Sequence, residues 1–302
     1  MANLKEIRQR IKSVKSTQQM TKAMKMVAAA KLRRAQERIL SLRPYALKLK
    51  EIMSDIAGNV NPEDIDSPFM VQRPVTNVLF IVVTSNRGLC GAFNTAICKH
   101  AEGVIKERFS SQHESGNLQV MCIGKKGFEY FQRRGYKLLG ENHDVFANLS
   151  FEEVNKAGQI ALDGFANGDF DHVEIVYNEF RNVVVQNRVN EQFLPLQAEA
   201  HTGDDHGDDA HAGVNADYIF EPGQAEILAD LIPKSLRTAL YRSVLESNAG
   251  EQGARMTAMD SATENAEELL KSLRLSYNRA RQAAITTEIL EIVAGAEALA
   301  SS

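Results

Sequence analysis

The chain has 302 residues, a formal net charge of −4, 25% charged and 44% hydrophobic residues, so it is long enough to bury a full core in one or two domains. Its three cysteines have no CxxC spacing, which argues against a disulfide framework or a zinc site and indicates small buried thiols. The longest purely apolar run, residues 78–83, is far shorter than the ~20 residues of a membrane span, and the N-terminus lacks the apolar core of a signal peptide. We therefore expect neither a spanning segment nor export.

Charge is distributed unevenly along the chain. Residues 1–57 carry 14 Lys and Arg against 4 Asp and Glu, whereas residues 58–233 carry 13 against 26 and residues 234–302 carry 8 against 9. A basic N-terminal segment and an acidic middle imply a different kind of partner for each.

Residues 1–58 are predicted to form one long helix, because apolar residues recur at alternating steps of three and four, as in the seam of a coiled coil. That stripe consists of Leu4, Ile7, Ile11, Val14, Leu32, Ala35, Ile39, Leu42, Ala46, Leu49, Met53 and Ile56. Pro44 predicts a kink or local break. The polar residues Gln18, Thr21 and Lys25 interrupt the seam.

The basic stretch at residues 22–31 leaves four interpretations open. It fits a membrane-surface helix, a nucleic-acid contact, a contact with an acidic partner, or a solvated basic face. Basic residues do not alternate with aromatic ones here, which weakens the nucleic-acid interpretation.

Residues 74–198 are predicted to form a doubly wound, Rossmann-like α/β domain, because strand-like and helical patterns alternate. The expected strands are residues 76–83, 118–123, 173–177 and 183–193, and the expected helices are residues 95–109, 126–134 and 151–167. Residues 199–217 follow as a polar loop insertion with five aspartates and three histidines. A divalent metal site in this insertion is the minor alternative, because a loop does not fix a coordination geometry.

The loop from Ser85 to Asn94 follows the first expected strand, where α/β sheets commonly bind ligands. It matches neither GxGxxG nor GxxxxGK[ST] and has no lysine for nucleotide phosphates, so a tight structural turn is favoured over a nucleotide site. The chain also contains no G-x-S-x-G or HExxH motif and no credible Cys/His pair. We expect no catalytic residue, no cofactor and no bound metal.

Residues 218–302 are predicted to form a second, longer helix. Its seam consists of Met256, Met259, Thr263, Ala266, Leu270, Leu273, Tyr277, Ala280, Ala284 and Thr287. Gly250 and Gly253 fall inside it, each costing about 1 kcal/mol relative to alanine. We expect a helix held straight by packing, with a kink as the alternative.

The two terminal helices are expected to cover each other as an antiparallel coiled coil. The difference in their lengths leaves roughly 26 residues at the C-terminal tip without an intramolecular partner, on the order of 40 Å of helix. Six apolar tip residues wrap most of the circumference: Ile285, Ile289, Ile292, Val293, Ala296 and Leu299. A helix that is apolar nearly all round is a buried helix, so the tip predicts a sleeve of other chains, with folding back onto its own domain as the alternative.

Three motifs make nearly the whole chain resemble the γ subunits of F-type ATP synthases. They are the segment TKAMKMVAAAK at residues 21–31, the loop RGLCG at residues 87–91, and the segment ITTEILEIVAGAEA at residues 285–298, preceded by YNRARQ. Two departures are Ser85-Asn86, where the family usually has an aspartate before the arginine, and Gly91-Ala92-Phe93 in place of a glycine pair. The cysteine pair of the chloroplast redox-regulated form is absent, so thiol regulation is not expected.

The resemblance implies a non-catalytic rotor shaft. Its coiled coil would turn inside a ring of α and β subunits, couple ion flow through the membrane c-ring to the catalytic β subunits, and also contact the ε subunit. The implied location is the cytoplasmic face of the bacterial inner membrane, peripherally attached. A coiled-coil scaffold, including one for nucleic acid, and a nucleotide-binding α/β protein remain the alternatives.

The resemblance also implies roles for individual residues. Residues matching family positions that meet an acidic loop of a β subunit are Met24, Lys25, Arg255, Gln282, Thr286 and Glu288. The apolar tip corresponds to the bearing end of the shaft. Tyr218 and Glu221 lie in the segment expected near the ε subunit and the membrane ring.

Overall fold

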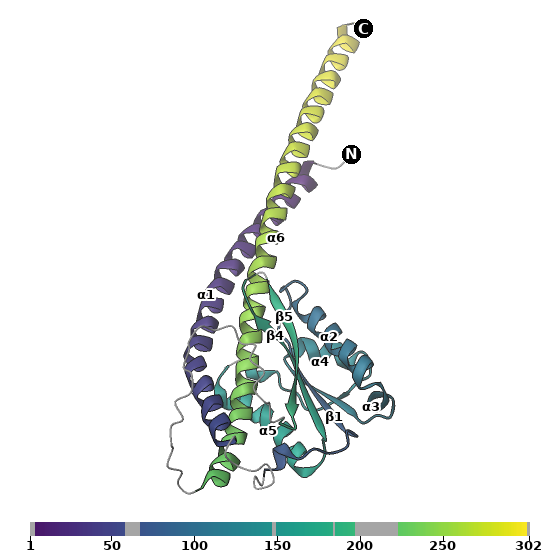
Figure 1. Ribbon diagram of the computed structural model, residues 1–302. Coiled ribbons are helices and arrows are strands. Elements are labelled where there is room, and N and C mark those ends of the chain that lie inside the picture. The colour runs from purple at the N-terminus through teal and green to yellow at the C-terminus, as the bar shows by residue number, and fades with distance from the viewer. Residues whose placement is uncertain (1–3, 58–66, 147–148, 184, 197–222, 301–302) are drawn as a thin grey trace.

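The computed structural model describes residues 4–57, 67–146, 149–183, 185–196 and 223–300. Two long helices, α1 (Leu4–Ala57) and α6 (Gln224–Ala300), lie side by side, and an α/β domain packs against the lower part of α6 (Figure 1). This arrangement confirms the predicted fold class of two terminal helices with a central α/β domain.

A five-stranded sheet in the order β3-β2-β1-β4-β5 forms the centre of the domain. Its strands are β1 (Val78–Val83), β2 (Leu118–Ile123), β3 (Lys137–Leu138), β4 (His172–Phe180) and β5 (Gln186–Leu194). Val78 of β1 pairs in parallel with Leu118 on one side and with His172 on the other, whereas β5 runs antiparallel to β4 at the edge. Every residue of β1 is buried, as expected for a parallel strand covered on both faces.

Helices cover both faces of this sheet. The remaining elements are η2 (Pro68–Met70), α2 (Phe93–Arg108), α3 (Ser110–Glu114), α4 (Lys125–Gln132), η3 (Asp144–Phe146) and α5 (Phe151–Asn167). α2 and α4 pack on one face, and α5 and α6 pack on the other. α5 begins at Ser150, whose side chain accepts a hydrogen bond from the backbone of Glu153, and ends at Gly168 in the left-handed region (φ 85°).

The first part of α6 belongs to the core of the domain, which sequence patterns did not reveal. Its buried residues there are Leu228, Ile232, Leu236, Leu240 and Val244, none more than 3% exposed. Gly158 of α5 permits the close approach, because a Cβ at this position would lie 2.5 Å from Cδ2 of Leu240. Two short elements, β3 and α3, were also not predicted, and β5 lies a few residues later than expected.

Both long helices continue through residues that commonly interrupt helices. α1 is unbroken at Pro44, contrary to the expected local break, and α6 is unbroken at Pro233, Gly250 and Gly253. Pro44 is exposed, so the carbonyl that loses its helical partner can bond to water. Among the described helices, none combines the length and apolar character needed to cross a bilayer.

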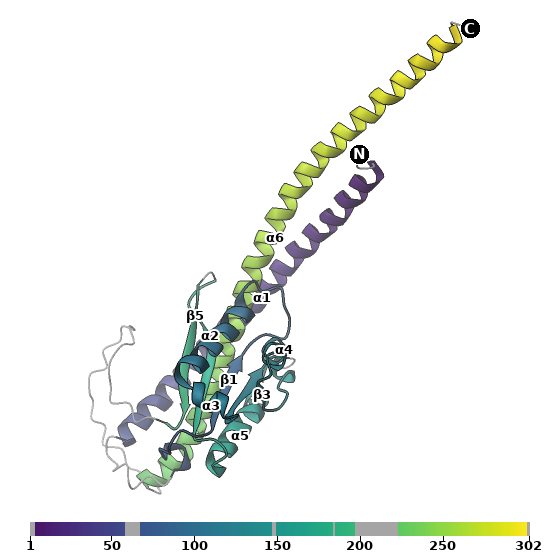
Figure 2. The ribbon, with the colours of Figure 1, turned by 90° about the vertical axis from the view of Figure 1, so that its right-hand side faces the viewer.

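The free end of α6 extends well beyond the N-terminal end of α1, as both views show (Figures 1 and 2). Arg8 near the start of α1 hydrogen-bonds to Tyr277 of α6, which places the end of the paired region there. The unpaired part of the described chain therefore begins near Arg281, a few residues later than predicted.

Candidate functional site

The two long helices pack through small and aliphatic residues. Ala28, Leu32 and Ala35 of α1 are each at most 5% exposed, and Met259, Ala266 and Leu270 of α6 are each at most 7% exposed. The predicted seam of α6 is confirmed from Met256 to Ala280, all at least half-buried. Its last two members, Ala284 and Thr287, are exposed because α1 has already ended.

Polar pairs fill the place where the seam of α1 is interrupted. The Thr21 and Thr263 hydroxyls lie 2.7 Å apart, and Lys25 Nζ lies 2.5 Å from an Asp260 carboxylate oxygen. The side chains of Lys25 and Asp260 are 39% and 47% exposed, so this ion pair contributes little stability. Hydrogen-bond geometry is directional, so these pairs fix the register of the two helices along the shaft.

The C-terminal tip is apolar and uncovered. Side chains from Arg281 to Ala296 are all exposed, including Ile285, Ile289, Ile292 and Val293 at 48–67%. The alternative in which the tip folds back onto the domain is therefore wrong. Leu299 lies beyond the side chains that the structure describes. A contiguous exposed apolar surface of this kind marks an interaction site.

The structure separates the predicted β-subunit contacts into two groups along the shaft. Met24 and Lys25 are partly buried, with Lys25 paired to Asp260, whereas Gln282, Thr286 and Glu288 are exposed on the unpaired part of α6. Asp260 and Gln282 are about 33 Å apart at 1.5 Å per residue. The two groups are therefore too far apart for a single loop to touch both, although each contact remains a prediction.

Arg255, the remaining predicted contact, points into the chain rather than away from it. Its guanidinium donates hydrogen bonds to the backbone carbonyls of Gly88 and Arg87 and to the carboxylate of Glu251. Only 11% of the Arg255 side chain is exposed. The contact of Arg255 with a β subunit remains a prediction.

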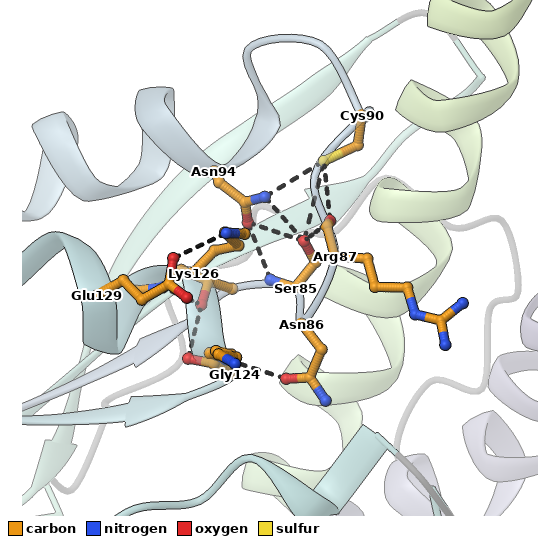
Figure 3. Close-up of polar contacts among 11 residues, drawn as sticks. Ser85, Asn86, Arg87, Cys90, Asn94, Gly124, Lys126 and Glu129 are labelled. Atoms are coloured by element: carbon orange, nitrogen blue, oxygen red, sulfur yellow. Dashed lines mark hydrogen bonds and ion pairs between the residues drawn. The ribbon is translucent and has the colours of Figure 1, made fainter.

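The loop after β1 is held by hydrogen bonds among its own polar groups and to the neighbouring residues Lys125 and His143 (Figure 3). Asn94 accepts a hydrogen bond from the backbone N–H of Ser85 at 2.9 Å and donates one to the Ser85 hydroxyl at 2.8 Å. The Ser85 hydroxyl in turn donates to the Arg87 carbonyl at 2.8 Å. Asn86 accepts from the backbone of Lys125 and donates to the carbonyl of His143.

This network favours the tight structural turn over the nucleotide site. The polar side chains that would meet a phosphate are already bonded within the loop, and the Arg87 side chain points away from it in Figure 3. The loop therefore acts as a rigid connection between β1, α2 and the neighbouring part of α6.

A buried carboxyl group lies where α6 crosses the sheet. Burial raises the pKa of Glu246 to about 7, with the Arg242 guanidinium 3.6 Å away lowering it in part. Tyr177 donates a hydrogen bond to Glu191 in the same region at 3.0 Å, and burial raises the pKa of its phenol. The folded chain thus favours the protonated form of Glu246 more than an exposed glutamate would.

The three cysteines are free and buried, as the sequence suggested. Burial raises the pKa of Cys98 to about 12 and raises the pKa values of Cys90 and Cys122 as well, so none is an activated thiolate. Within the described ranges, no three His, Cys, Asp or Glu side chains gather as a metal site.

Some predicted sites lie outside the described residues. They are Tyr218, Glu221 and the insertion at residues 199–217 with its candidate metal ligands.

Sequence reasoning missed Asp260 and Glu251. Both were detectable in part, because Asp260 follows a seam residue, and Glu251 precedes Arg255 by four, the spacing of a helical ion pair.

Known proteins resemble this chain over its full length. A family model described as ATP synthase matches residues 3–299. The ATP synthase gamma chain of Cytophaga hutchinsonii is 50% identical over 299 residues, covering 99% of both chains. That of Chloroherpeton thalassium is 51% identical over 308 residues, covering 100% of both.

Solved structures show the same fold at low sequence identity. The rotor of the Euglena gracilis mitochondrial ATP synthase matches with a TM-score of 0.62 and 19% identity, covering 93% of this chain and 98% of that one. The central stalk and c-ring structure of the Tetrahymena thermophila enzyme matches with a TM-score of 0.55 and 20% identity, covering 80% and 99%. Given the family match and the full-length relatives, the chain belongs to the ATP synthase family and is similar throughout to its gamma chains.

Proposed function

We propose that this chain is the central rotor shaft of an F-type ATP synthase and has no catalytic activity of its own. The observation that carries the proposal is the uncovered apolar tip of α6, which projects past α1 on a chain that belongs to the ATP synthase family. Rotation of an asymmetric shaft would present different faces to each catalytic β subunit in turn, and so shift each site between conformations by differential contacts.

The proposed parts follow the predicted boundaries. Residues 1–58 and 218–302 form the shaft, and residues 74–198 form the domain that connects it to the ε subunit and the membrane c-ring. Residues from Ile285 to Leu299 form the bearing in a sleeve of α and β subunits. Because this segment carries few charges, its rotation would not meet deep electrostatic minima that hinder it.

Contacts with β subunits are proposed at two levels. Met24 and Lys25, with the surface supported by Arg255, form the lower level and fit an acidic loop. Gln282, Thr286 and Glu288 form the upper level. Their separation along α6 requires different segments of the surrounding subunits at each level.

The proposed location is the cytoplasmic face of the bacterial inner membrane. Attachment would be peripheral and through the other subunits of the complex.

Reconstitution with and without this chain tests the proposal. Omission should abolish ATP synthesis driven by an ion gradient, while the purified chain alone should neither bind nor hydrolyse ATP. It should co-purify with α and β subunits in fewer copies than either, because one shaft serves a whole ring. Gradient-driven synthesis by a complex lacking the chain would contradict the proposal.

A further inference from the structure

A short segment of α6, residues 249–258, joins the part of the helix that packs on the sheet to the part that extends beyond the domain. Gly250 and Gly253 are both buried there, and each faces the domain. A Cβ on Gly250 would lie 3.4 Å from both Gln186 and Phe93, and one on Gly253 would lie 3.3 Å from the carbonyl oxygen of Val183. The two glycines thus bring the helix backbone close to the domain at this junction.

Arg255 forms the polar connection across the junction. Its Nη1 lies 2.5 Å from the carbonyl oxygen of Gly88, and its Nη2 lies 3.2 Å from that of Arg87. Nη2 also donates to Glu251 at 2.5 Å, one helical turn back along α6. With exposed fractions of 11% and 10%, the side chains of Arg255 and Glu251 form a shielded ion pair that keeps the guanidinium aimed at the loop.

The loop that Arg255 binds is itself rigid and has one unusual residue. Leu89 has φ 66°, in the left-handed region that non-glycine residues seldom occupy, and its side chain is 65% exposed. This conformation follows directly on the two carbonyls that accept from Arg255. A residue keeps an unfavourable backbone conformation only when the surrounding structure holds it there. The hydrogen bonds from Arg255 to the two preceding carbonyls help to hold Leu89 in this conformation.

Other contacts between α6 and the rest of the chain change at this point. Below it, α6 packs on the sheet through aliphatic side chains such as Leu240 and Val244. Beyond it, α6 no longer contacts the sheet, and Asp260, Thr263 and Tyr277 hydrogen-bond to α1, which also packs on the earlier part of α6. Apolar contacts have no preferred direction, whereas a planar guanidinium bound to two fixed carbonyls has one.

We infer that Arg255 is a positioning residue that fixes the rotational setting of the shaft relative to the α/β domain, by holding the loop at residues 87–91 against α6. The inference rests on the proposed rotor function, because a fixed setting is what lets rotation of the domain pass to the shaft without slip. This positioning role differs from a contact between Arg255 and a β subunit, because the loss of Arg255 should loosen the loop in the isolated chain as well.

Labelling of Cys90 tests the inference without any partner. Cys90 is in the same loop and 1% exposed, while Cys98 on the buried face of α2 and Cys122 of β2, also at most 1% exposed, lie in the core and report global unfolding. In the full chain, Arg255→Gln should raise the rate of Cys90 labelling by a maleimide roughly tenfold, the effect of one lost charged hydrogen bond on local opening. Cys98 and Cys122 should keep their wild-type rates.

Two further variants sharpen the labelling test. Glu251→Gln should raise the Cys90 rate less than Arg255→Gln, because the carbonyl contacts remain. Arg274→Gln, at an exposed arginine of the same helix, is the matched control and should change nothing. Unchanged Cys90 labelling in Arg255→Gln, or equal acceleration of all three cysteines, would overturn the inference.

The reconstituted complex tests the consequence for coupling. Arg255→Gln should lower the number of ions pumped per ATP hydrolysed, and Arg255→Lys, which retains the charge and can reach one carbonyl, should restore part of that ratio. An unchanged ratio with accelerated Cys90 labelling would overturn the coupling role. The rotor proposal is tested separately, by the reconstitution that omits this chain. If that proposal failed, the expected Cys90 labelling rates of the isolated chain would be unchanged.

Discussion

Thr21 of α1 and Thr263 of α6 share a hydrogen bond of 2.7 Å inside the otherwise apolar seam of the shaft. Each hydroxyl has one proton, so the threonine that donates across the pair leaves its own helix carbonyl, while the other donates to a carbonyl of its own helix, Thr21 to Gln18 or Thr263 to Met259. Either threonine can therefore be replaced, because the hydroxyl of the other can still donate to a carbonyl of its own helix.

Valine substitutions at these two threonines should be non-additive. Thr21→Val and Thr263→Val should each lower the free energy of unfolding by about 1 kcal/mol, because each removes the shared hydrogen bond. The double variant should lose clearly less than the sum, since neither partner is then left behind. Urea denaturation of the four proteins measures this, and strict additivity would show that the pair has no coupling energy.

Replacement of Glu246 should change how stability depends on pH. Its ordinary pKa of 4.5 is raised to about 7 in the folded chain, so the folded state favours the protonated form. The contribution of this group to stability is present below pH 4.5 and is lost as pH rises through 7. Glu246→Gln should thus be more stable than wild type at pH 8, by on the order of 2–3 kcal/mol, and similar to it at pH 4.5.

Chemical denaturation at several pH values between 4.5 and 8 checks this expectation. Glu264→Gln, on an exposed face of the same helix, is the control and should follow the wild-type pH profile. If Glu246→Gln shows no gain at pH 8 relative to that control, Glu246 is ionised in the folded chain at neutral pH.

Three glycines of α6 should respond differently to alanine. Gly295→Ala should stabilise the helix by up to about 1 kcal/mol, because a Cβ there meets nothing within 4 Å. Gly250→Ala should be nearly neutral, because the flexible Gln186 side chain can yield. Gly253→Ala should be destabilising, because its Cβ would press on the backbone carbonyl of Val183. Thermal unfolding followed by circular dichroism ranks the variants, and a gain for Gly253→Ala equal to that of Gly295→Ala would refute the packing explanation.

A lysine at position 24 should weaken coupling in the assembled complex. Met24→Lys places a second cation beside Lys25, whose charge is only partly neutralised by Asp260 at the surface. Against an acidic partner loop, the added charge would over-stabilise one angular position of the shaft, so hydrolysis should continue while ions pumped per ATP decrease. Met26→Lys, two residues along on another face and 61% exposed, is the control. Equal effects of both variants would argue against the assigned contact.

Local patterns were sufficient to predict the long helices and the central strands. Steps of three and four between apolar residues persist over many turns in α1 and α6, and the run from Val78 to Val83 is apolar throughout. Such signals depend only on neighbouring residues. The tip was predictable for the same reason, because Ile285 and Ile289 continue the pattern past the end of any intramolecular partner.

The contacts that build the junction were not predictable, because they join residues far apart in the sequence. Arg255 and Gly88 are separated by 167 residues, and Lys25 and Asp260 by 235. Periodicity also cannot tell whether an apolar face of α6 meets a helix or a sheet, so the burial of Leu236 in the domain core was missed. Gly250 and Gly253 were noticed as a cost to the helix, and only the structure shows that the backbone carbonyl of Val183 lies close enough to limit the size of residue 253.

The unbroken course of α6 from Gln224 to Ala300 has a mechanical consequence. A continuous helix contains no swivel, so twist applied inside the domain reaches the tip through a single hydrogen-bonded backbone. Torsional stiffness is not uniform along that path: it is high where α1 runs alongside and falls beyond Arg281, where one helix remains. The last turns are therefore the most compliant part of α6, whereas the section that is paired with α1 and ends near Tyr277 resists twisting.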